Sequence, residues 1–170
     1  MYKRQILYNA LGDEAHLKSV LEISRQVIQL VTDNMVSRQY HMVAACEAAA
    51  AHLALGGFLP DSQGMASVTA ERKEHLSQAL ECSQAALNIY KDFGFTQVVE
   101  CTGEEILYRH SLALAANGRG EEAADALEKA YNEMMRKQAL IPENTTYHVS
   151  YLENIRLHRE IAARFASLQA

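Results

Sequence analysis

Apolar residues along this chain recur at intervals of three and four, which is the periodicity of an amphipathic helix. Between residues 76 and 90, Leu76, Leu80, Ser83, Leu87 and Tyr90 fall on one helical stripe. No stretch alternates apolar and polar residues as a half-buried strand does. Only two prolines interrupt the 170 residues. The pattern therefore predicts an all-α fold.

The same periodicity predicts six helices joined by short turns, which makes neighbouring helices antiparallel. A glycine at position 94 suits the left-handed residue that ends a helix. One connection is longer, because residues 56–67 are rich in glycine, proline and serine and read as an inserted loop. The predicted helices span residues 13–33, 37–55, 68–91, 96–117, 118–138 and 144–165.

Glycines mark a possible internal repeat. Gly12, Gly56 and Gly118 each follow a predicted helix and precede another, at intervals of 44 and 62 residues. Self-similarity of this kind is the mark of repeat architectures. The difference between the two intervals indicates that one repeat carries the inserted loop.

The stretch LYRHSLALAANGRGEEAADALEKAY, residues 107–131, resembles a tetratricopeptide repeat. Small residues in such repeats let two antiparallel helices approach closely. The matching positions are Leu107, Ser111 and Leu114 in the first helix, Gly118 in the turn, and Ala123, Leu127 and Ala130 in the second helix. The resemblance implies antiparallel helix pairs stacked as an α-solenoid over residues 6–170, with a capping helix at about 144–165.

Residues 106–161 also resemble the C-terminal part of the helical-repeat arms of large bacterial signalling proteins. These proteins include signal-transduction ATPases, LuxR-type activators, kinases and nucleotide cyclases. The resemblance implies an arm that mediates protein–protein contacts or restrains an upstream domain. The expected partner is therefore a protein, a peptide or a domain of the same chain.

The repeat pattern places a set of mostly apolar residues on the first helix of each pair, where a solenoid has its concave face. These residues either form a groove for a partner or pack against one another and the inserted loop. A different function would be small-molecule sensing, with Cys46, Leu53 and Tyr108 around a closed pocket. The expected groove residues are Val43, Cys46, Ala50, Leu53, Glu105, Tyr108, Leu112 and Ala115.

Net charge and cysteine spacing indicate which class of partner and which cellular compartment to expect. The net charge is −5 and the basic residues are scattered, so direct nucleic-acid binding is not expected. Cys46, Cys82 and Cys101 lack CxxC spacing and fall within predicted helices, which favours core thiols in a reducing cytoplasm. No apolar run is long enough for a membrane span or a secretory signal.

Candidate chemistry is sparse, so the sequence predicts neither an enzyme nor a cofactor. The seven histidines include no pair with metal-ligand spacing, and His75 and His110 are expected on helix surfaces. Adjacent Glu104 and Glu105 diverge around a helix and cannot act together as acid and base. No phosphate-binding loop or nucleophile elbow occurs. A convergent buried polar cluster is not expected.

Residues 1–5, MYKRQ, raise a separate question about the start of the chain. The codons GTG TAT AAG AGA CAG encode this string, and they match the end of an adapter from transposase-based sequencing libraries. The helix that ends before Gly12 is also shorter than its counterparts. We expect residues 1–5 to be an adapter scar and residues 6–170 to be a fragment of a longer protein. The stripe Leu17, Leu21, Ile28 and Val31 would then be partly bare, and the fragment would self-associate.

Overall fold

The structure is a computed structural model, and it describes residues 14–30, 35–58, 69–96 and 98–169. These residues form seven helices connected by turns. The helices are α2 (Glu14–Gln29), α3 (Met35–Leu55), α4 (Ala70–Asp92), α5 (Gly103–Ala116), α6 (Gly120–Gln138), α7 (Thr146–Glu153) and α8 (Arg156–Gln169).

The all-α prediction is confirmed for the described residues. Their β-structure is limited to one isolated bridge between Val98 and Cys101. None of the helices described here combines the length and apolar character that crossing a membrane requires.

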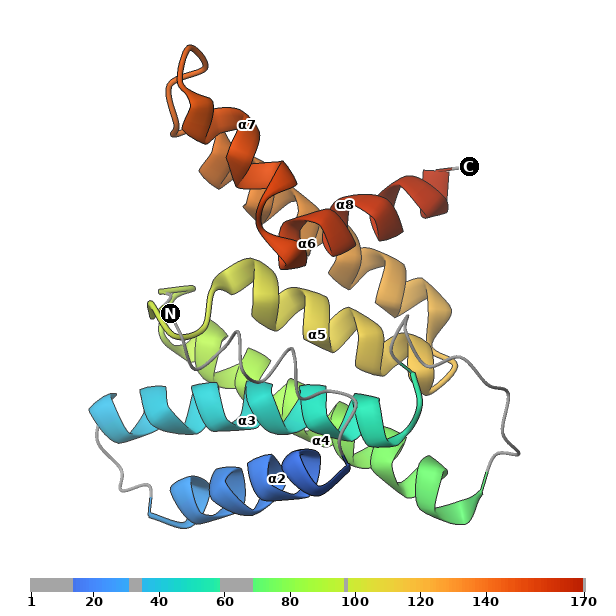
Figure 1. The fold of residues 1–170 in the computed structure, drawn as a ribbon. Coiled ribbons are helices and arrows are strands. Elements are labelled where there is room, and N and C mark those ends of the chain that lie inside the picture. The colour runs from blue at the N-terminus through green and yellow to red at the C-terminus, as the bar shows by residue number, and fades with distance from the viewer. Residues whose placement is uncertain (1–13, 31–34, 59–68, 97, 170) are drawn as a thin grey trace.

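The helices stack approximately in chain order, from α2 and α3 at one end to α7 and α8 at the other (Figure 1). Helix α3 packs against α2, α4 and α5, and α5 packs against α4 and α6. Helix α8 packs on α6, while the short helix α7 contacts both α6 and α8. The main contacts thus join helices that are adjacent or next but one in the sequence.

Three helices end in the same way, at glycines with positive φ. These are Gly57, Gly94 and Gly118, with φ of 68°, 62° and 75°. In each case the following N–H donates to a carbonyl five residues back: Phe58 to Leu53, Phe95 to Tyr90, and Arg119 to Leu114. This bond satisfies a carbonyl that the helix leaves unpaired. The predicted stops at Gly94 and Gly118 are confirmed.

The sequence suggested that Gly56 ends α3, but its role is in packing between helices. The left-handed residue after α3 is Gly57. At Gly56, an added Cβ would lie 2.3 Å from the Leu76 side chain. Gly56 therefore allows α3 and α4 to approach closely. Gly12 lies outside the described residues.

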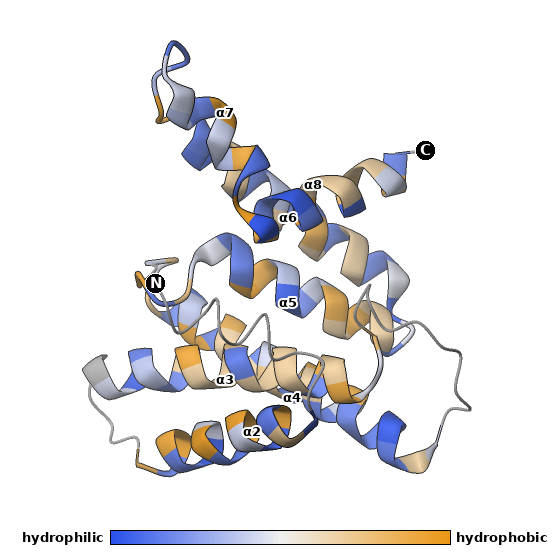
Figure 2. Ribbon diagram, viewed as in Figure 1, coloured by the Kyte–Doolittle hydropathy of each residue, from blue (hydrophilic) through white to orange (hydrophobic). Residues whose placement is uncertain are grey.

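The core consists of apolar side chains between successive helices. One cluster joins α3, α4 and the start of α5 around Met42, Cys46, Tyr90 and Ile106. A second joins α3 to α6 and α8. The second half of α3 is mostly pale or orange by hydropathy, whereas the first turns of α4 are blue (Figure 2). The second cluster includes Leu53, Tyr108, Leu112, Leu127, Met134 and Ile161.

The predicted helical stripes of α4 and α6 are confirmed by burial. Ser83, Leu87 and Tyr90 are buried on α4, with Leu76 and Leu80 half-buried. The three predicted positions on α6, Ala123, Leu127 and Ala130, are buried, and so is Met134 one turn further on. Small residues at two of these positions let α5 lie close to α6.

Two predicted helix boundaries are wrong. Helix α5 begins at Gly103, not at residue 96, because the preceding segment turns through the Val98–Cys101 bridge. At Gly103 the Tyr90 hydroxyl occupies the place of a side chain, 2.1 Å from where a Cβ would lie. The start of this helix is therefore set by packing against α4.

The expected capping helix over 144–165 is two helices, with a break at Asn154–Ile155. Side chains from α8 bind the last carbonyls of α7: Arg159 Nη1 donates to the Glu153 carbonyl at 2.5 Å, and His158 Nδ1 lies 2.7 Å from that of Tyr151. These bonds satisfy the end of α7 and turn α8 across α6 (Figure 1). The inserted loop at 56–67 lies largely outside the described residues, as do residues 1–13.

Candidate functional site

The eight expected groove residues lie on α3 and α5, but most are not accessible. Six of them are at most 5% exposed, and Val43 and Ala115 are half-buried. An open groove is therefore not present at those six side chains. The buried six are Cys46, Ala50, Leu53, Glu105, Tyr108 and Leu112.

The face formed by α3 and α5 is covered from within the chain. Leu53 and Tyr108 share one apolar cluster with Ile161 of α8, and Phe58 and Phe165 pack at its edge. The Arg164 guanidinium lies 5.6 Å from the centroid of the Phe58 ring. Leu53 and Tyr108 therefore pack against side chains of the same chain.

Cys46 and Glu105 belong to a buried polar layer between α3 and α5. The Cys46 thiol contacts that of Cys101, and this contact, burial and nearby Glu105 raise the pKa of Cys46. Glu105 lies 4.0 Å from Arg109 one turn along α5, and both side chains are 5% exposed. Cys46 is therefore a protonated core thiol at neutral pH.

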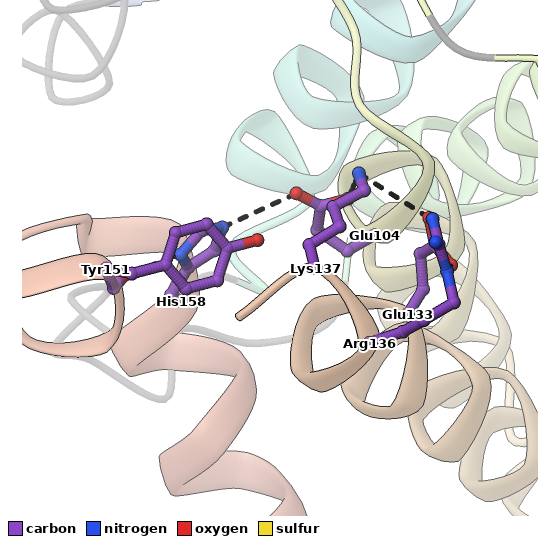
Figure 3. A network of polar contacts seen from close by, with 6 residues as sticks. All are labelled: Glu104, Glu133, Arg136, Lys137, Tyr151 and His158. Carbon is purple, nitrogen blue, oxygen red and sulfur yellow. Dashed lines mark hydrogen bonds and ion pairs between the residues drawn. The ribbon is translucent and has the colours of Figure 1, made fainter. Parts of the chain in front are cut away.

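A second polar cluster, the Glu104 network, joins α5, α6, α7 and α8 (Figure 3). Glu104 is 2% exposed. Its carboxylate hydrogen-bonds Lys137 Nζ of α6, and its Oε1 lies 3.4 Å from His158 Nε2 of α8. Burial acts to raise the pKa of Glu104, but the bonds to His158 and Lys137 outweigh it and lower the pKa to about 2.

Two hydrogen-bond acceptors face the ring nitrogens of His158. Its Nδ1 lies 2.7 Å from the Tyr151 carbonyl oxygen, and its Nε2 faces the Glu104 carboxylate at 3.4 Å. A carbonyl oxygen can only accept, so Nδ1 donates the bond to Tyr151. His158 thus links the end of α7 to Glu104 of α5.

Outer members of the Glu104 network lie on α6 and α7. Glu133 accepts from Arg136 Nε at 2.8 Å and lies 3.6 Å from Lys137 Nζ. The ring of Tyr151 lies 4.2 Å from that of His158. The Tyr151 hydroxyl is buried, and the described residues offer it no hydrogen-bond partner. Burial, with nearby Glu104, raises the pKa of Tyr151.

The expectation that no buried polar cluster would form is wrong. Glu104 and His158 are separated by 54 residues and meet only because α8 folds back onto α5 and α6. Glu133 and Lys137, four residues apart on α6, also form a pair, and their side chains are 19% and 13% exposed. The sequence did offer one signal of the cluster: Lys137, a basic residue in the last turn of α6, lies one turn from the apolar Met134.

The chemistry of the Glu104 network favours docking of the C-terminal helices over catalysis. Each of its charges is compensated by another: Glu104 by Lys137 and His158, and Glu133 by Arg136. Glu104 and His158 are 3% and 4% exposed at their side chains. A buried charge is tolerated when it is paired in this way.

Histidines also pair across α3, α4 and α5. His52 Nδ1 lies 3.0 Å from His75 Nδ1, and His110 Nδ1 lies 3.0 Å from Ser83 Oγ. His110 is 6% exposed, so its expected surface position is wrong. Burial lowers the pKa of both His52 and His110 to about 4. Within the described ranges, no three histidine, cysteine or acidic side chains gather as metal ligands.

A cavity of about 300 Å³ lies beside the outer members of the Glu104 network, between the end of α4, α5 and α6. Its apolar lining is Tyr90, Phe95 and Leu107. Its polar lining comes from one face of α6: Lys129, Asn132, Glu133 and Arg136. The sequence does not reveal this site, because the residues of its two walls lie far apart in the chain.

Comparison with protein-family models, with curated proteins and with solved structures gives no match.

Proposed function

We propose that this chain is a helical-repeat module of the tetratricopeptide type that mediates protein–protein contacts or regulates an attached domain of a signalling protein. Its helix pairs would be α3–α4 and α5–α6, with α8 as the cap. The observation that carries the proposal is the packing of α3 against both α4 and α5. In a solenoid, the first helix of each pair contacts its own partner and the first helix of the next pair.

Details of the α5–α6 pair support the same proposal. The turn at Gly118 is left-handed, and Ser111, Ala123 and Ala130 are buried between the helices. These are the positions at which the resemblance to a tetratricopeptide repeat requires a turn and small residues.

The alternative function is a small-molecule sensor. The buried face around Cys46, Leu53 and Tyr108 would then open around a metabolite. Leu53 and Tyr108 already pack in one cluster with Ile161 of α8, and Cys46 packs in a second cluster, so a ligand would have to displace packed apolar groups. The protein-contact function needs no such rearrangement, and we place it first. Neither function uses the chain as an enzyme.

An experimental structure tests the architecture. Superposing α3–α4 on α5–α6 should give a rotation and translation that also continues into α8. A closed bundle in which α2 packs against α6 would contradict the solenoid.

Peptide selection tests the function. We expect a phage-displayed peptide library, selected on the folded chain and counter-selected on heat-denatured chain, to yield an enriched motif with saturable binding. A thermal-shift screen of metabolites serves as the parallel test of the sensor, because a ligand that binds only the native state raises the melting temperature. A metabolite that stabilises the chain, with no enriched peptide, would replace the first function by the second.

A further inference from the structure

The cavity beside α6 has an aromatic wall, and one of its residues, Phe95, has a strained backbone conformation. Phe95 has a φ of 63°, in the left-handed region, although Gly94 has already ended α4 there. A bulky residue in this conformation costs about 1–2 kcal/mol. The Phe95 ring is 60% exposed and packs edge-to-face on Tyr90, with the ring centroids 5.3 Å apart. Strain of this kind concentrates at functional sites.

The opposite wall of the cavity carries positive charge. Lys129 and Arg136 lie on one face of α6, two turns apart, with Glu133 between them. Lys129 is exposed, and no hydrogen bond or ion pair is found for it among the described residues. Arg136 is 60% exposed at its side chain and uses Nε and Nη2 to bind Glu133. A guanidinium has five donors, so Arg136 retains others.

The size of the cavity bears on the kind of ligand. Pockets for small molecules and cofactors run from about 300 to 1,000 Å³. At about 300 Å³ this cavity is at the lower limit. It suits a single apolar side chain anchored between the aromatic wall and Leu107, with the rest of the ligand on the surface.

We propose that this cavity binds an acidic linear peptide of a partner protein, with one apolar side chain between Phe95 and Leu107 and carboxylates on Lys129 and Arg136. The charges complement each other, since two cations and one paired carboxylate leave the polar wall positive. The proposal rests on the proposed function and names the class of partner that the module takes.

The experiment is fluorescence anisotropy on the full chain with the labelled peptide DDEFEDD. We expect saturable binding that weakens as salt is added, because the contacts are partly electrostatic. The peptide DDESEDD, which lacks the anchor, and the cationic peptide KKKFKKK should each bind at least tenfold more weakly.

Variants locate the binding to the cavity. Lys129→Glu should weaken binding of DDEFEDD at least tenfold, whereas Lys73→Glu, an equal charge change at an exposed position of α4, should change it less than twofold. Phe95→Gly should also weaken binding at least tenfold without lowering the melting temperature, since glycine accepts the left-handed backbone. Tyr147→Ala removes a 73% exposed ring elsewhere and serves as its control.

Three results would overturn the proposal: no binding of DDEFEDD at 1 mM, equal weakening by Lys129→Glu and Lys73→Glu, or undiminished binding by Phe95→Gly. The two proposals fail separately. If selected peptides bind the chain but ignore the Lys129 and Phe95 variants, the module function stands and this site is rejected. If no peptide binds at all, both are rejected.

Discussion

Glu104 holds a full negative charge in a place that solvent barely reaches. Water no longer stabilises the carboxylate there, so Lys137 and His158 must do so. Because these partners come from α6 and α8, one side chain on α5 ties three helices together (Figure 3). The energetic value of the arrangement lies mainly in the penalty for breaking it.

Replacing Glu104 by glutamine should destabilise the fold. The substitution keeps the shape of the side chain but leaves Lys137 and His158 facing a neutral amide. We expect a loss of about 2–4 kcal/mol in the free energy of unfolding, since breaking a buried pair is strongly unfavourable. Urea denaturation followed by circular dichroism measures it. Glu128→Gln, at an exposed position of α6, should cost less than about 0.5 kcal/mol, and an equal loss in both variants would contradict the argument.

Acid should weaken the native chain through the same carboxyl group. The pKa of Glu104 is about 2 in the fold, against an ordinary value of 4.5. Its contribution is therefore complete above pH 4.5 and is lost as the pH falls from 4.5 toward 2. In urea titrations across this range, Glu104→Gln should show a shallower decline than the native chain. Parallel declines would mean that the carboxyl group is not held ionised.

We expect the buried His110 to cause a second loss of folding stability, at a milder pH than Glu104 does. Burial, with Lys91 and Arg119 nearby, lowers the pKa of His110 from 6.5 to about 4. Between these values the unfolded chain binds the proton and the folded chain does not, so stability falls as the pH drops from 6.5 to 4. The contribution of His110 is up to about 3 kcal/mol. His110→Gln should remove part of this slope in urea titrations, and an unchanged slope would contradict the assignment to His110.

Local pattern predicted which residues of α4 and α6 are buried, but it could not identify these titratable partners. The stripe through Leu87 and Tyr90 follows from helical spacing alone. Burial of Glu104 depends on α8, which lies more than 50 residues away in the chain. His110 is buried against α4, where its Nδ1 lies 3.0 Å from Ser83 Oγ. Each of these facts requires the packing of helices, which a single sequence does not specify.

Element boundaries were predicted best where a helix ends by a local mechanism. The glycines after α4 and α5 provide a left-handed residue and were recognisable in the sequence. The start of α5 and the break between α7 and α8 were not, because side chains of other helices determine them. At the break, His158 and Arg159 of α8 take the carbonyls of Tyr151 and Glu153 in place of a continuing helix.

Docking of α8 should depend on Ile161. This side chain is fully buried in the cluster that contains Tyr108 and Met134. Ile161→Ala should cost about 2–4 kcal/mol in the free energy of unfolding, through lost transfer energy and the cavity left behind. Leu168→Ala on the same helix removes a side chain that is 51% exposed and should cost less than about 1 kcal/mol. Similar losses from the two variants in urea denaturation would show that α8 does not dock through this face.

At the scale of the whole molecule, the number of buried residues differs from helix to helix along the stack. Helix α5 lies in the middle and has eleven buried residues, whereas α2 at one end has two, Leu17 and Ser24. Of the stripe that was expected to be partly bare, Leu17 is buried at 5% exposure, and Leu21 and Ile28 are half-buried. Val31 lies outside the described residues. Ile23 of α2 and Leu30, which directly follows this helix, are 61% and 79% exposed.

Leu30 directly follows α2, seven residues after Ile23, and the two exposed side chains give this end of the stack an apolar patch. Such a patch is stabilised by covering it, and a second copy can do so at high concentration. We expect the chain to self-associate, with a mass above that of a monomer in size-exclusion chromatography with light scattering. The double variant Ile23→Lys, Leu30→Lys should shift the equilibrium toward monomer at least tenfold, because the added charges would face one another across the contact. Tyr147→Lys with Val149→Lys places the same charges on exposed positions of α7 and should leave the mass unchanged. A native chain that stays monomeric at millimolar concentration, or equal effects of the two double variants, would show that the end of the stack at α2 does not bind a second copy.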